Sequence, residues 1–567
     1  MLPMLSTMSD YQLTTGSIFE HGVKVHAQSE VLTWEGDHAR RATFREMGDR
    51  VRQLARALRR LGIGPGDRVG TLCWNTQEHL EAYYAIASMG AVVHTLNIRL
   101  APEQLTFVID HGEDRVVFVD ASLYPVLARV VKQLRTVEHV IVVGQAPGLP
   151  GNVLHYEQLL AAEQPDFTWP DLDERSAAAM CHTTGTTGDP KGVIYSHRSI
   201  YLHALSICSP WCIGLSTSDR ALCIVPLFHA NGWGIPFAGW LAGIDFLMPG
   251  AFLQPEPLCR FITTCRPTIG AGVPTILSAM FNHARAHGVD LSLFHLLMCG
   301  GAALPRSLAE AYRAHYNVPV VQGWGLTETS PVAAFARPPR LCPPGEELNW
   351  ATKTGRVIPG VELRVCDGDT VLPWDGESVG EFEVRGPWVT ASYYGNPAPE
   401  RFHDGWLRTG DVGTVDERGY LRITDRSKDV IKSGGEWISS VELENAITDH
   451  PGVLEAAVIG VPDERWDERP LACVVSKDGA PIDTAILRAH LASRVARWWI
   501  PERWAFIAEV PKTSVGKYDK KALRAQYADG QIAEIVDACE RASPETACAD
   551  TQEAAAAETD MKVTGRL

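Results

Sequence analysis

The chain has no long apolar run, no Cys-x-x-Cys pair and no excess of positive charge. A membrane-spanning helix needs about 18 consecutive apolar residues, so we expect none. The thirteen cysteines are odd in number and scattered, which argues against a zinc site or a disulfide framework and favours reduced thiols. The formal net charge of −16 argues against a nucleic-acid partner, because such proteins carry a basic surface.

Targeting signals are also lacking at both ends. Residues 1–15 contain no basic segment followed by an apolar run, so no secretory signal is expected. The last residues, Gly565-Arg566-Leu567, match the Ser-Lys-Leu peroxisomal address only imperfectly. We therefore expect a cytoplasmic protein. Its 567 residues, 45% hydrophobic and 21% charged, are ordinary for a globular chain and suffice for two or three domains.

Helical and strand patterns alternate along most of the chain and predict an α/β fold. Strand–helix alternation implies parallel sheets with helices on their faces. We expect a large multi-layer N-terminal domain over 1–425, a hinge at 426–428, and a small mobile α/β domain over 429–530. Residues 531–567, rich in Ala, Glu, Asp and Thr, predict a disordered tail, with 532–538 as a helical extension.

The most informative stretch is Thr183–Gly192, which holds four threonines, three glycines and a lysine. Glycines let backbone N–H groups approach an anion, threonines add donors and the lysine adds a point charge. The stretch is not a Walker A loop, because Gly192 follows Lys191 where Ser or Thr would hold magnesium. Strand-like residues 193–195 follow, so this phosphate loop is expected to join two strands. A flexible Gly/Thr turn is the alternative.

Four further segments combine small residues with one or two chemical groups. Glu328 beside Thr327 supplies oxygen ligands for a hard cation, although Thr before Glu is also a helix cap. Asp411 ends a tight turn and could hold a ribose diol or cap the turn. The charged run 425–437 is either a solvated linker or a hinge. Lys517 lies in a Pro/Thr/Ser/Gly loop near the end, where most lysines are simply solvated.

In this order, over about residues 30 to 527, the motifs resemble the signature of the adenylate-forming superfamily, which includes acyl-CoA synthetases, luciferases and the adenylation domains of peptide synthetases. The His229-x-x-x-Trp233 segment is similar to the gate of bacterial medium- and long-chain fatty-acyl-CoA synthetases, although a core Trp at a bend is the alternative. On that resemblance, Trp233 closes an acyl tunnel and His229 lies near the carboxylate.

The resemblance implies roles for individual residues. Contacts with ATP or AMP fall to Thr183, Thr184, Gly185, Thr186, Thr187, Gly188, Lys191, Gly301, Ala302, Gly323, Trp324, Gly325, Thr327, Asp411, Arg426 and Lys432. The catalytic set is Lys517, Glu328, Thr184 and His229, with Thr327 and Glu328 at Mg²⁺ and Lys428 as the hinge residue. The CoA arm would pass Gly434, Gly435, Glu436, Trp437 and Trp466.

The implied activity is an ATP-dependent ligation of a fatty acid to CoA through an acyl-adenylate, with release of AMP and pyrophosphate. The alternative substrate is a short, branched, sulfur-containing or aryl acid. A different class of function, a non-catalytic nucleotide-binding regulator, is the remote alternative. The resemblance also implies a homodimer. Peripheral membrane contact for lipid uptake is a further expectation.

Overall fold

The computed structural model describes residues 6–146, 148–183, 189–396, 398–426, 428–433, 436–512 and 518–536, with only the backbone of Glu436 and Trp437. Two compact units are present. The first comprises Met1–Ser378, Phe382–Thr409 and Val415–Arg422, and the second comprises Val379–Glu381, Gly410–Thr414 and the chain from Ile423. Within the described ranges, no helix is both long and apolar enough to cross a bilayer.

A seven-stranded sheet in the first unit has the order β7-β6-β5-β3-β4-β8-β9. Its strands are β3 (Arg68–Leu72), β4 (Val92–Thr95), β5 (Asp114–Asp120), β6 (His139–Val143), β7 (Leu154–His155), β8 (Ala177–His182) and β9 (Gly192–Ser196). All pairs are parallel except β8 with β9, which are antiparallel. The expected phosphate loop therefore does join two neighbouring strands, as the sequence predicted.

A second sheet begins with a parallel region in the order β14-β13-β12-β10-β11-β1, and β2 pairs antiparallel with β1. These strands are β1 (Glu30–Trp34), β2 (Ala39–Thr43), β10 (Arg220–Leu222), β11 (Asp245–Met248), β12 (Ile269–Gly272), β13 (Leu296–Cys299) and β14 (Val320–Gly325). The parallel strands are buried and apolar because helices cover them.

Beyond β14 the same sheet continues in the order β14-β15-β16-β22-β21-β19-β17-β18, and β20 pairs with β21. The bounds are β15 (Val332–Phe335), β16 (Gly355–Val357), β17 (Glu362–Asp367), β18 (Thr370–Leu372), β19 (Gly380–Arg385), β20 (Phe402–His403), β21 (Trp406–Val415) and β22 (Tyr420–Arg426). Pairs such as β14 with β15 and β15 with β16 are antiparallel. The parallel pairing implied by strand–helix alternation therefore does not extend to this region.

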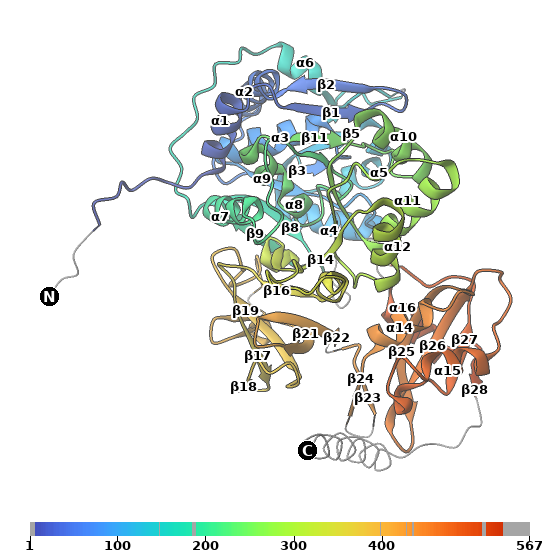
Figure 1. Ribbon diagram of the computed structural model, residues 1–567. Helices are drawn as coiled ribbons and strands as arrows, with labels where there is room; N and C mark the ends of the chain where they lie inside the picture. The colour runs from blue at the N-terminus through green and yellow to red at the C-terminus, as the bar shows by residue number, and fades with distance from the viewer. Residues whose placement is uncertain are drawn as a thin grey trace. The chain divides into compact units, whose positions relative to one another are not determined.

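Helices of the first unit pack around these sheets (Figure 1). Their bounds are α1 (Thr15–Val25), α2 (Phe44–Arg60), α3 (Gln77–Ser88), α4 (Pro102–Gly112), α5 (Tyr124–Ala128), α6 (Tyr156–Ala161), α7 (His197–Cys208), α8 (Ala230–Trp233), α9 (Ile235–Ala242), α10 (Pro255–Cys265), α11 (Pro274–His287), α12 (Arg306–Tyr316) and α13 (Glu347–Ala351). The start of α2 follows from a capping box between Thr43 and Glu46.

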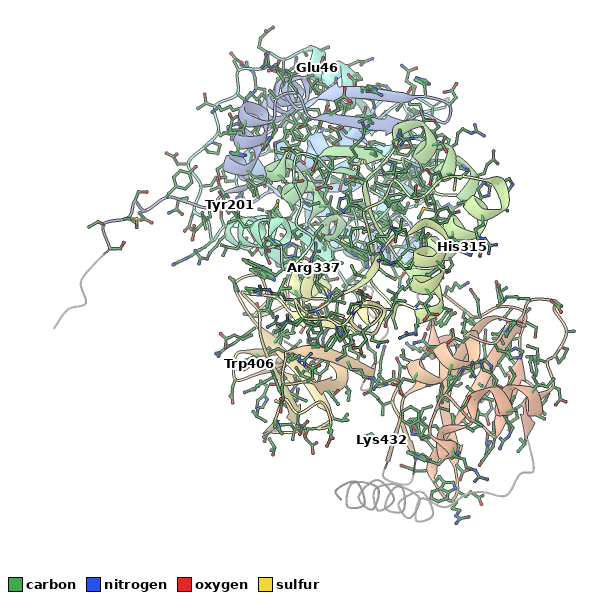
Figure 2. The ribbon with its side chains drawn as sticks, in the orientation of Figure 1. Glu46, Tyr201, His315, Arg337, Trp406 and Lys432 are labelled. Atoms are coloured by element: carbon green, nitrogen blue, oxygen red, sulfur yellow. The ribbon has the colours of Figure 1, made fainter. Side chains whose placement is uncertain are left out.

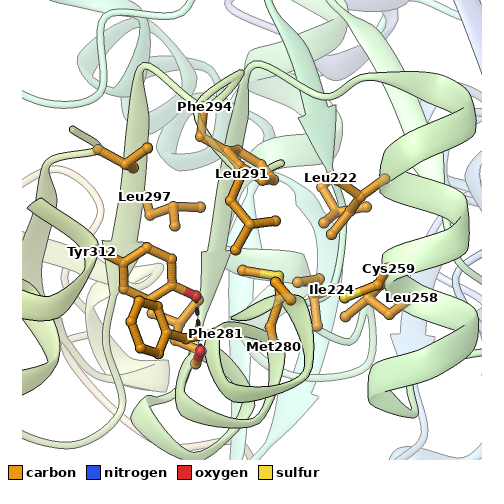
Figure 3. Close-up of a cluster of buried hydrophobic side chains, with 14 of the residues drawn as sticks. Leu222, Ile224, Leu258, Cys259, Met280, Phe281, Leu291, Phe294, Leu297 and Tyr312 are labelled. Atoms are coloured by element: carbon orange, nitrogen blue, oxygen red, sulfur yellow. Dashed lines mark hydrogen bonds between the residues drawn. The ribbon is translucent and has the colours of Figure 1, made fainter. Parts of the chain in front are cut away.

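One core cluster lies between the strands β10, β12 and β13 and the helices α10, α11 and α12 (Figure 3). Leu222, Met280 and Leu297 are at most 2% exposed. The one polar atom that Tyr312 brings into this cluster is satisfied, because its hydroxyl donates to the carbonyl of Leu277 at 2.8 Å. Arg337, labelled in Figure 2, donates from Nε to the carbonyl of Cys212 at 2.6 Å, in the loop that follows α7.

The second unit contains a six-stranded sheet, with the order β24-β23-β26-β27-β28 and β25 paired to β26. Its elements are β23 (Ile431–Ser433), β24 (Glu436–Ile438), α14 (Ser440–Thr448), β25 (Val453–Asp463), β26 (Asp467–Ser476), α15 (Thr484–Leu491), β27 (Arg503–Phe506), α16 (Lys520–Ala528) and β28 (Ile535–Val536). The predicted helical extension over 532–538 is wrong where it is described, because β28 pairs with β27 and Ile532 is buried.

Candidate active site

The described ends of the phosphate loop are held together by the β8–β9 hairpin. Thr183 N donates to the carbonyl of Lys191 at 2.9 Å, and Lys191 N donates back to Thr183 Oγ1 at 3.2 Å. The Lys191 ammonium lies 3.5 Å from Glu400 Oε1 and 4.9 Å from the ring centroid of Tyr393. The loop residues Thr184–Gly188 lie outside the described residues.

The Thr327–Glu328 segment lies beside β9 in the same unit. The Tyr195 hydroxyl, on β9, donates to the carbonyl of Thr327 at 2.8 Å. Glu328 is 9% exposed, and its Oε1 accepts a 2.6 Å hydrogen bond from the Tyr393 hydroxyl. The strand that leaves the phosphate loop therefore positions the predicted cation ligands. A short single-turn 3-10 helix spans Thr327–Thr329, but its N-cap residue is Leu326, so Thr327 lies inside the helix and is not its cap.

Glycine at position 325 has a steric cause, because a Cβ there would lie 1.7 Å from the carbonyl oxygen of Pro331. Upstream, Gln322 Nε2 donates to the carbonyl of Ala302 at 3.1 Å, which ties the Gly301–Ala302 segment to β14. The Trp324 ring is 8% exposed and meets Phe382 edge to face, with ring centroids 6.0 Å apart. These contacts bring the Gly301–Ala302 segment and the end of β14 together.

The gate segment has an unusual backbone. Ala230, Asn231, Gly232, Trp233 and Gly234 all have positive φ, between 45° and 76°, so α8 is a single left-handed turn. Left-handed conformation costs a non-glycine residue about 1–2 kcal/mol. Such strain persists only where the surrounding structure holds it in place, and it gathers at functional sites.

Hydrogen bonds from buried side chains hold this turn in place. The amide oxygen of Asn231 accepts from Cys181 Sγ at 3.2 Å and from the Tyr83 hydroxyl at 3.4 Å. Asn75 supports the preceding residues by donating to the carbonyl of Val225 and accepting from Leu227 N. The sequence analysis missed Asn231, Tyr83 and Cys181, because their meeting depends on tertiary contacts between distant segments.

A narrow apolar cavity of about 20 Å³ lies beside the gate segment. Gly232, Ile235 and Pro236, which flank Trp233, line one part of it. Its other walls come from β10, β11, β12 and β13, and include Phe246, Met248 and Met298. None of its lining residues is charged. This lining suits an apolar group and disfavours a carboxylate, and the walls would have to move apart to admit an acyl chain.

In the second unit, Asp411 is 3% exposed and forms an ion pair with Arg426, with Asp411 Oδ1 2.7 Å from Arg426 Nε. Lys428 follows in a turn in which Asp429 N donates to the carbonyl of Arg426. Burial lowers the pKa of the Lys428 ammonium. Lys432 lies on β23, exposed and labelled in Figure 2. Trp466 is half-buried, and its backbone N–H donates to the Asp463 carboxylate.

Next to this turn, a buried charge cluster joins three elements of the second unit. Lys520 Nζ lies 2.7 Å from Glu444 Oε1 and also donates to Ser440 Oγ. The backbone N–H of Ser440 donates to Asp425 Oδ2 at 2.7 Å. Burial raises the pKa of Glu444 to about 7 and also raises that of Asp425. Asp425, which precedes the predicted hinge, is therefore anchored to α14. The charged run does contain structural residues as well as candidate ligands.

Several predicted residues cannot be placed. Lys517, Gly434 and Gly435 lie outside the described residues, and the side chains of Glu436 and Trp437 are not described. Their roles stay predictions. Among the residues that are described, no cluster of three or more His, Cys, Asp or Glu side chains could hold a metal ion by itself. A single carboxylate at Glu328 nevertheless suits Mg²⁺, which is held in nucleotide sites largely by phosphate oxygens and water.

Comparison with known proteins places the chain in a family. Residues 19–394 match the AMP-binding enzyme family, and residues 442–517 match the AMP-binding enzyme C-terminal domain. The chain belongs to this family of AMP-forming ligases, which confirms the resemblance and the predicted α/β class. ATP and CoA as co-substrates are consistent with membership of this family.

Individual relatives are ligases of different acids. The chain is 42% identical over 530 residues to a long-chain-fatty-acid–CoA ligase of Thermus thermophilus, covering 92% of this chain and 97% of the relative. It is 41% identical over 539 residues to a 3-methylmercaptopropionyl-CoA ligase of Ruegeria lacuscaerulensis, covering 93% and 99%. The structure of an anthranilate CoA ligase in complex with anthranoyl-AMP superposes with a TM-score of 0.83, at 27% identity over 92% of this chain and 100% of that chain.

Proposed function

We propose that this enzyme converts a medium- to long-chain fatty acid to its acyl-CoA through an acyl-adenylate. The apolar cavity beside the gate segment is the observation that carries the proposal, because its lining offers an acyl chain hydrophobic contact and no charge. Each methylene buried there contributes up to about 0.8 kcal/mol. The relatives of known activity include a long-chain fatty-acid ligase, which supports the same substrate class.

In the first half-reaction a carboxylate oxygen forms a bond to the α-phosphorus of ATP, and the bond from that phosphorus to pyrophosphate breaks. Both reactants are anions, so cations must offset their repulsion. We assign this task to Lys517 and to Lys191 with the donors of the phosphate loop. Glu328 and Thr327 would hold Mg²⁺, which supplies charge neutralisation on the phosphates, while Tyr393 orients the Glu328 carboxylate.

In the second half-reaction the CoA sulfur attacks the acyl carbonyl, AMP leaves, and the thiol proton is released. We propose that Asp411 and Arg426 hold the ribose, and that the small domain over 429–530 moves about Lys428 between the two half-reactions. The segment 434–437 and Trp466 would then contact the CoA arm. His229, the residue immediately before α8, is the candidate contact for the substrate carboxylate.

A sulfur-containing short acid is the second candidate. Cys223, Met248 and Met298 line the cavity, and thioether and thiol surfaces are polarisable and adapt to a ligand sulfur. The relative that ligates 3-methylmercaptopropionate is similar to this chain to the same degree as the fatty-acid ligase.

Release of AMP across acids of two to eighteen carbons, with 3-methylmercaptopropionate and benzoate included, tests the substrate class. We expect the highest kcat/KM for a straight chain of medium or greater length. A maximum at 3-methylmercaptopropionate or benzoate would replace the fatty-acid proposal, and absence of AMP with every acid would favour a regulator.

Acid-dependent pyrophosphate exchange, measured with CoA omitted, isolates the adenylation step. The Lys517→Ala variant should lose about 10²–10³ in exchange rate and keep ATP binding. Exchange at the wild-type rate in this variant would remove Lys517 from the mechanism.

A further inference from the structure

Four titratable side chains form a continuous hydrogen-bonded chain beneath the phosphate loop. His94 Nδ1 lies 2.9 Å from both carboxylate oxygens of Asp114. His94 Nε2 lies 2.9 Å from His182 Nδ1, and His182 Nε2 lies 2.9 Å from His111 Nδ1. The residues come from four elements: His94 from β4, His111 from α4, Asp114 from β5 and His182 from β8.

The inner end of the chain is closed to solvent. His94 and Asp114 are both 0% exposed. Two glycines make the room: a Cβ on Gly112 would lie 2.6 Å from His94 Nδ1, and one on Gly70 would lie 2.8 Å from Asp114 Oδ2. Glycine at both positions therefore leaves the space that the buried His94–Asp114 pair occupies, and any larger residue there would clash with the pair.

The outer end of the chain lies at the phosphate loop. His182 is the last residue before Thr183 and pairs with Gly192, the first residue after Lys191. A Cβ on Gly192 would lie 3.3 Å from His182 Nε2, and Gly192 O accepts a 2.9 Å hydrogen bond from Tyr394 N. His182 thus packs against the residues through which the chain enters and leaves the loop.

The partner at the far end reaches the same region. The His111 ring meets Tyr394 edge to face at 5.3 Å, and a Cβ on Gly395 would lie 3.2 Å from His111 Nε2. Asp189, inside the loop, acts electrostatically on His111. His111 therefore links α4 to the loop as well as to His182.

Hydrogen bonding fixes the state of each ring. Burial and the neighbouring imidazoles lower the pKa of His182 to about 2, so it stays neutral with a single N–H. A carboxylate only accepts, so ionised Asp114 makes His94 Nδ1 the donor, and in a neutral His94 ring Nε2 is then the acceptor. His182 must then donate from Nδ1 and accept at Nε2 from His111 Nδ1–H. One carboxylate sets the tautomer of all three rings.

We propose that His182 is a positioning residue for the phosphate loop, held in one tautomer and one ring orientation by the chain His111–His182–His94–Asp114. The inference rests on the proposed function of that loop in binding ATP. It assigns no proton transfer to the reaction. The geometry of the loop ends, and hence ATP binding, depends on the hydrogen bonds that connect His182 through His94 to Asp114.

Three substitutions of His182 test the proposal. His182→Leu removes both hydrogen bonds, whereas His182→Asn and His182→Gln each keep a polar atom near one ring nitrogen. We expect His182→Leu to raise the KM for ATP and the Kd of ATP about tenfold, and to leave the KM values for acid and CoA within about twofold. The Asn and Gln variants should recover part of the loss.

A matched control is His79→Leu. His79 is 1% exposed in the same unit, and its ring nitrogens lie 3.0 Å from the carbonyl of Trp74 and from Thr71 Oγ1. It should lower the melting temperature without a selective change in KM for ATP. Equal effects of the two substitutions on all three KM values would reduce His182 to a packing residue and overturn the proposal.

Two further measurements do not depend on the His182 variants folding. In wild-type enzyme labelled with ¹⁵N-histidine, long-range correlation spectra should show Nδ1–H tautomers for the three rings, and ATP should shift the His182 and His111 signals. Unchanged signals on saturation with ATP would overturn the proposal. In a double-mutant cycle, Asp114→Asn and His111→Gln should each weaken ATP binding, and their combined effect should fall short of the sum. Strict additivity contradicts a shared chain. A wild-type protein that does not bind ATP would instead refute the proposed function.

Discussion

The indole ring of Trp233 lies directly against the backbone of Gly300, since a Cβ on Gly300 would lie 2.8 Å from Cη2 of Trp233. Gly300 follows β13 and precedes the Gly301–Ala302 segment, so the gate ring and the candidate nucleotide segment share a contact. No residue larger than glycine fits at position 300 while the ring keeps this position. Gly300 thus gives room to an aromatic ring of the protein itself.

Gly300→Ala should therefore displace the Trp233 ring. Overpacking of this kind costs about 1–3 kcal/mol, and we expect kcat/KM for long acids to fall roughly tenfold or more, with a smaller effect on the KM for ATP. AMP release with acids of different length measures the change. Gly272→Ala is the matched control, because Gly272 ends the adjacent strand β12. A Cβ there would make an ordinary 3.5 Å contact with the Leu277 side chain. Equal losses in the two variants would separate Gly300 from the gate.

The left-handed turn makes a second prediction, at Asn231, whose φ is 53°. Asn231→Ala loses both the side-chain anchor and a residue that tolerates this conformation, whereas Asn231→Gly loses only the anchor. The alanine variant should be less stable than the glycine variant by about 1 kcal/mol, and both should show an altered preference for acid chain length. Thermal unfolding and the acid panel measure the two effects. Wild-type chain-length preference in both variants would show that the anchor does not shape the cavity.

Tyr393→Phe tests the support of the candidate magnesium ligand. The lost hydroxyl donates to a carboxylate at 2.6 Å, and hydrogen bonds to charged groups contribute about 1.5–3 kcal/mol. We expect the Mg²⁺ concentration for half-maximal pyrophosphate exchange to rise about tenfold. Tyr394→Phe serves as the control, since the Tyr394 ring contacts His111. An unchanged Mg²⁺ dependence in Tyr393→Phe would remove Glu328 from the metal site.

The buried cluster around Lys520 predicts a pH dependence of the second unit. The pKa of Glu444 is raised from 4.5 to about 7 in the folded chain, so the folded state binds the extra proton between these values. The free energy of unfolding should therefore fall as pH rises from about 4.5 to about 7, on the order of 1–3 kcal/mol, and level off above. Hydrogen exchange of peptides from α14 and α16, corrected for intrinsic rates, measures this.

Two variants bracket that result. Glu444→Gln should flatten the slope because the titrating group is gone. Lys520→Met should steepen it, because Glu444 and Asp425 lose their counter-charge, and at pH 8 it should cost about 3–5 kcal/mol. A wild-type slope identical to that of Glu444→Gln would mean that Glu444 is already ionised in this range.

Much of the fold was readable from local pattern. The α/β alternation and the strand after the phosphate loop were predicted correctly, because buried strands and amphipathic helices carry strong periodic signals. The antiparallel strands between Val332 and His403 were not predicted. Most of these strands are short, and some pair with segments far along the chain, such as β16 with β22.

The sequence alone determined the class of chemistry, because the Gly/Thr/Lys stretch around Thr183 and the later segment at Glu328 follow the order of the adenylate-forming motifs. Only the tertiary structure decided what surrounds them. That Tyr393 meets Glu328, that Asn231 meets Cys181, and that Asp114 meets His94 each depend on segments brought together by sheet pairing and core packing. Local sequence specifies which groups are available, whereas non-local burial specifies which of them share a hydrogen bond.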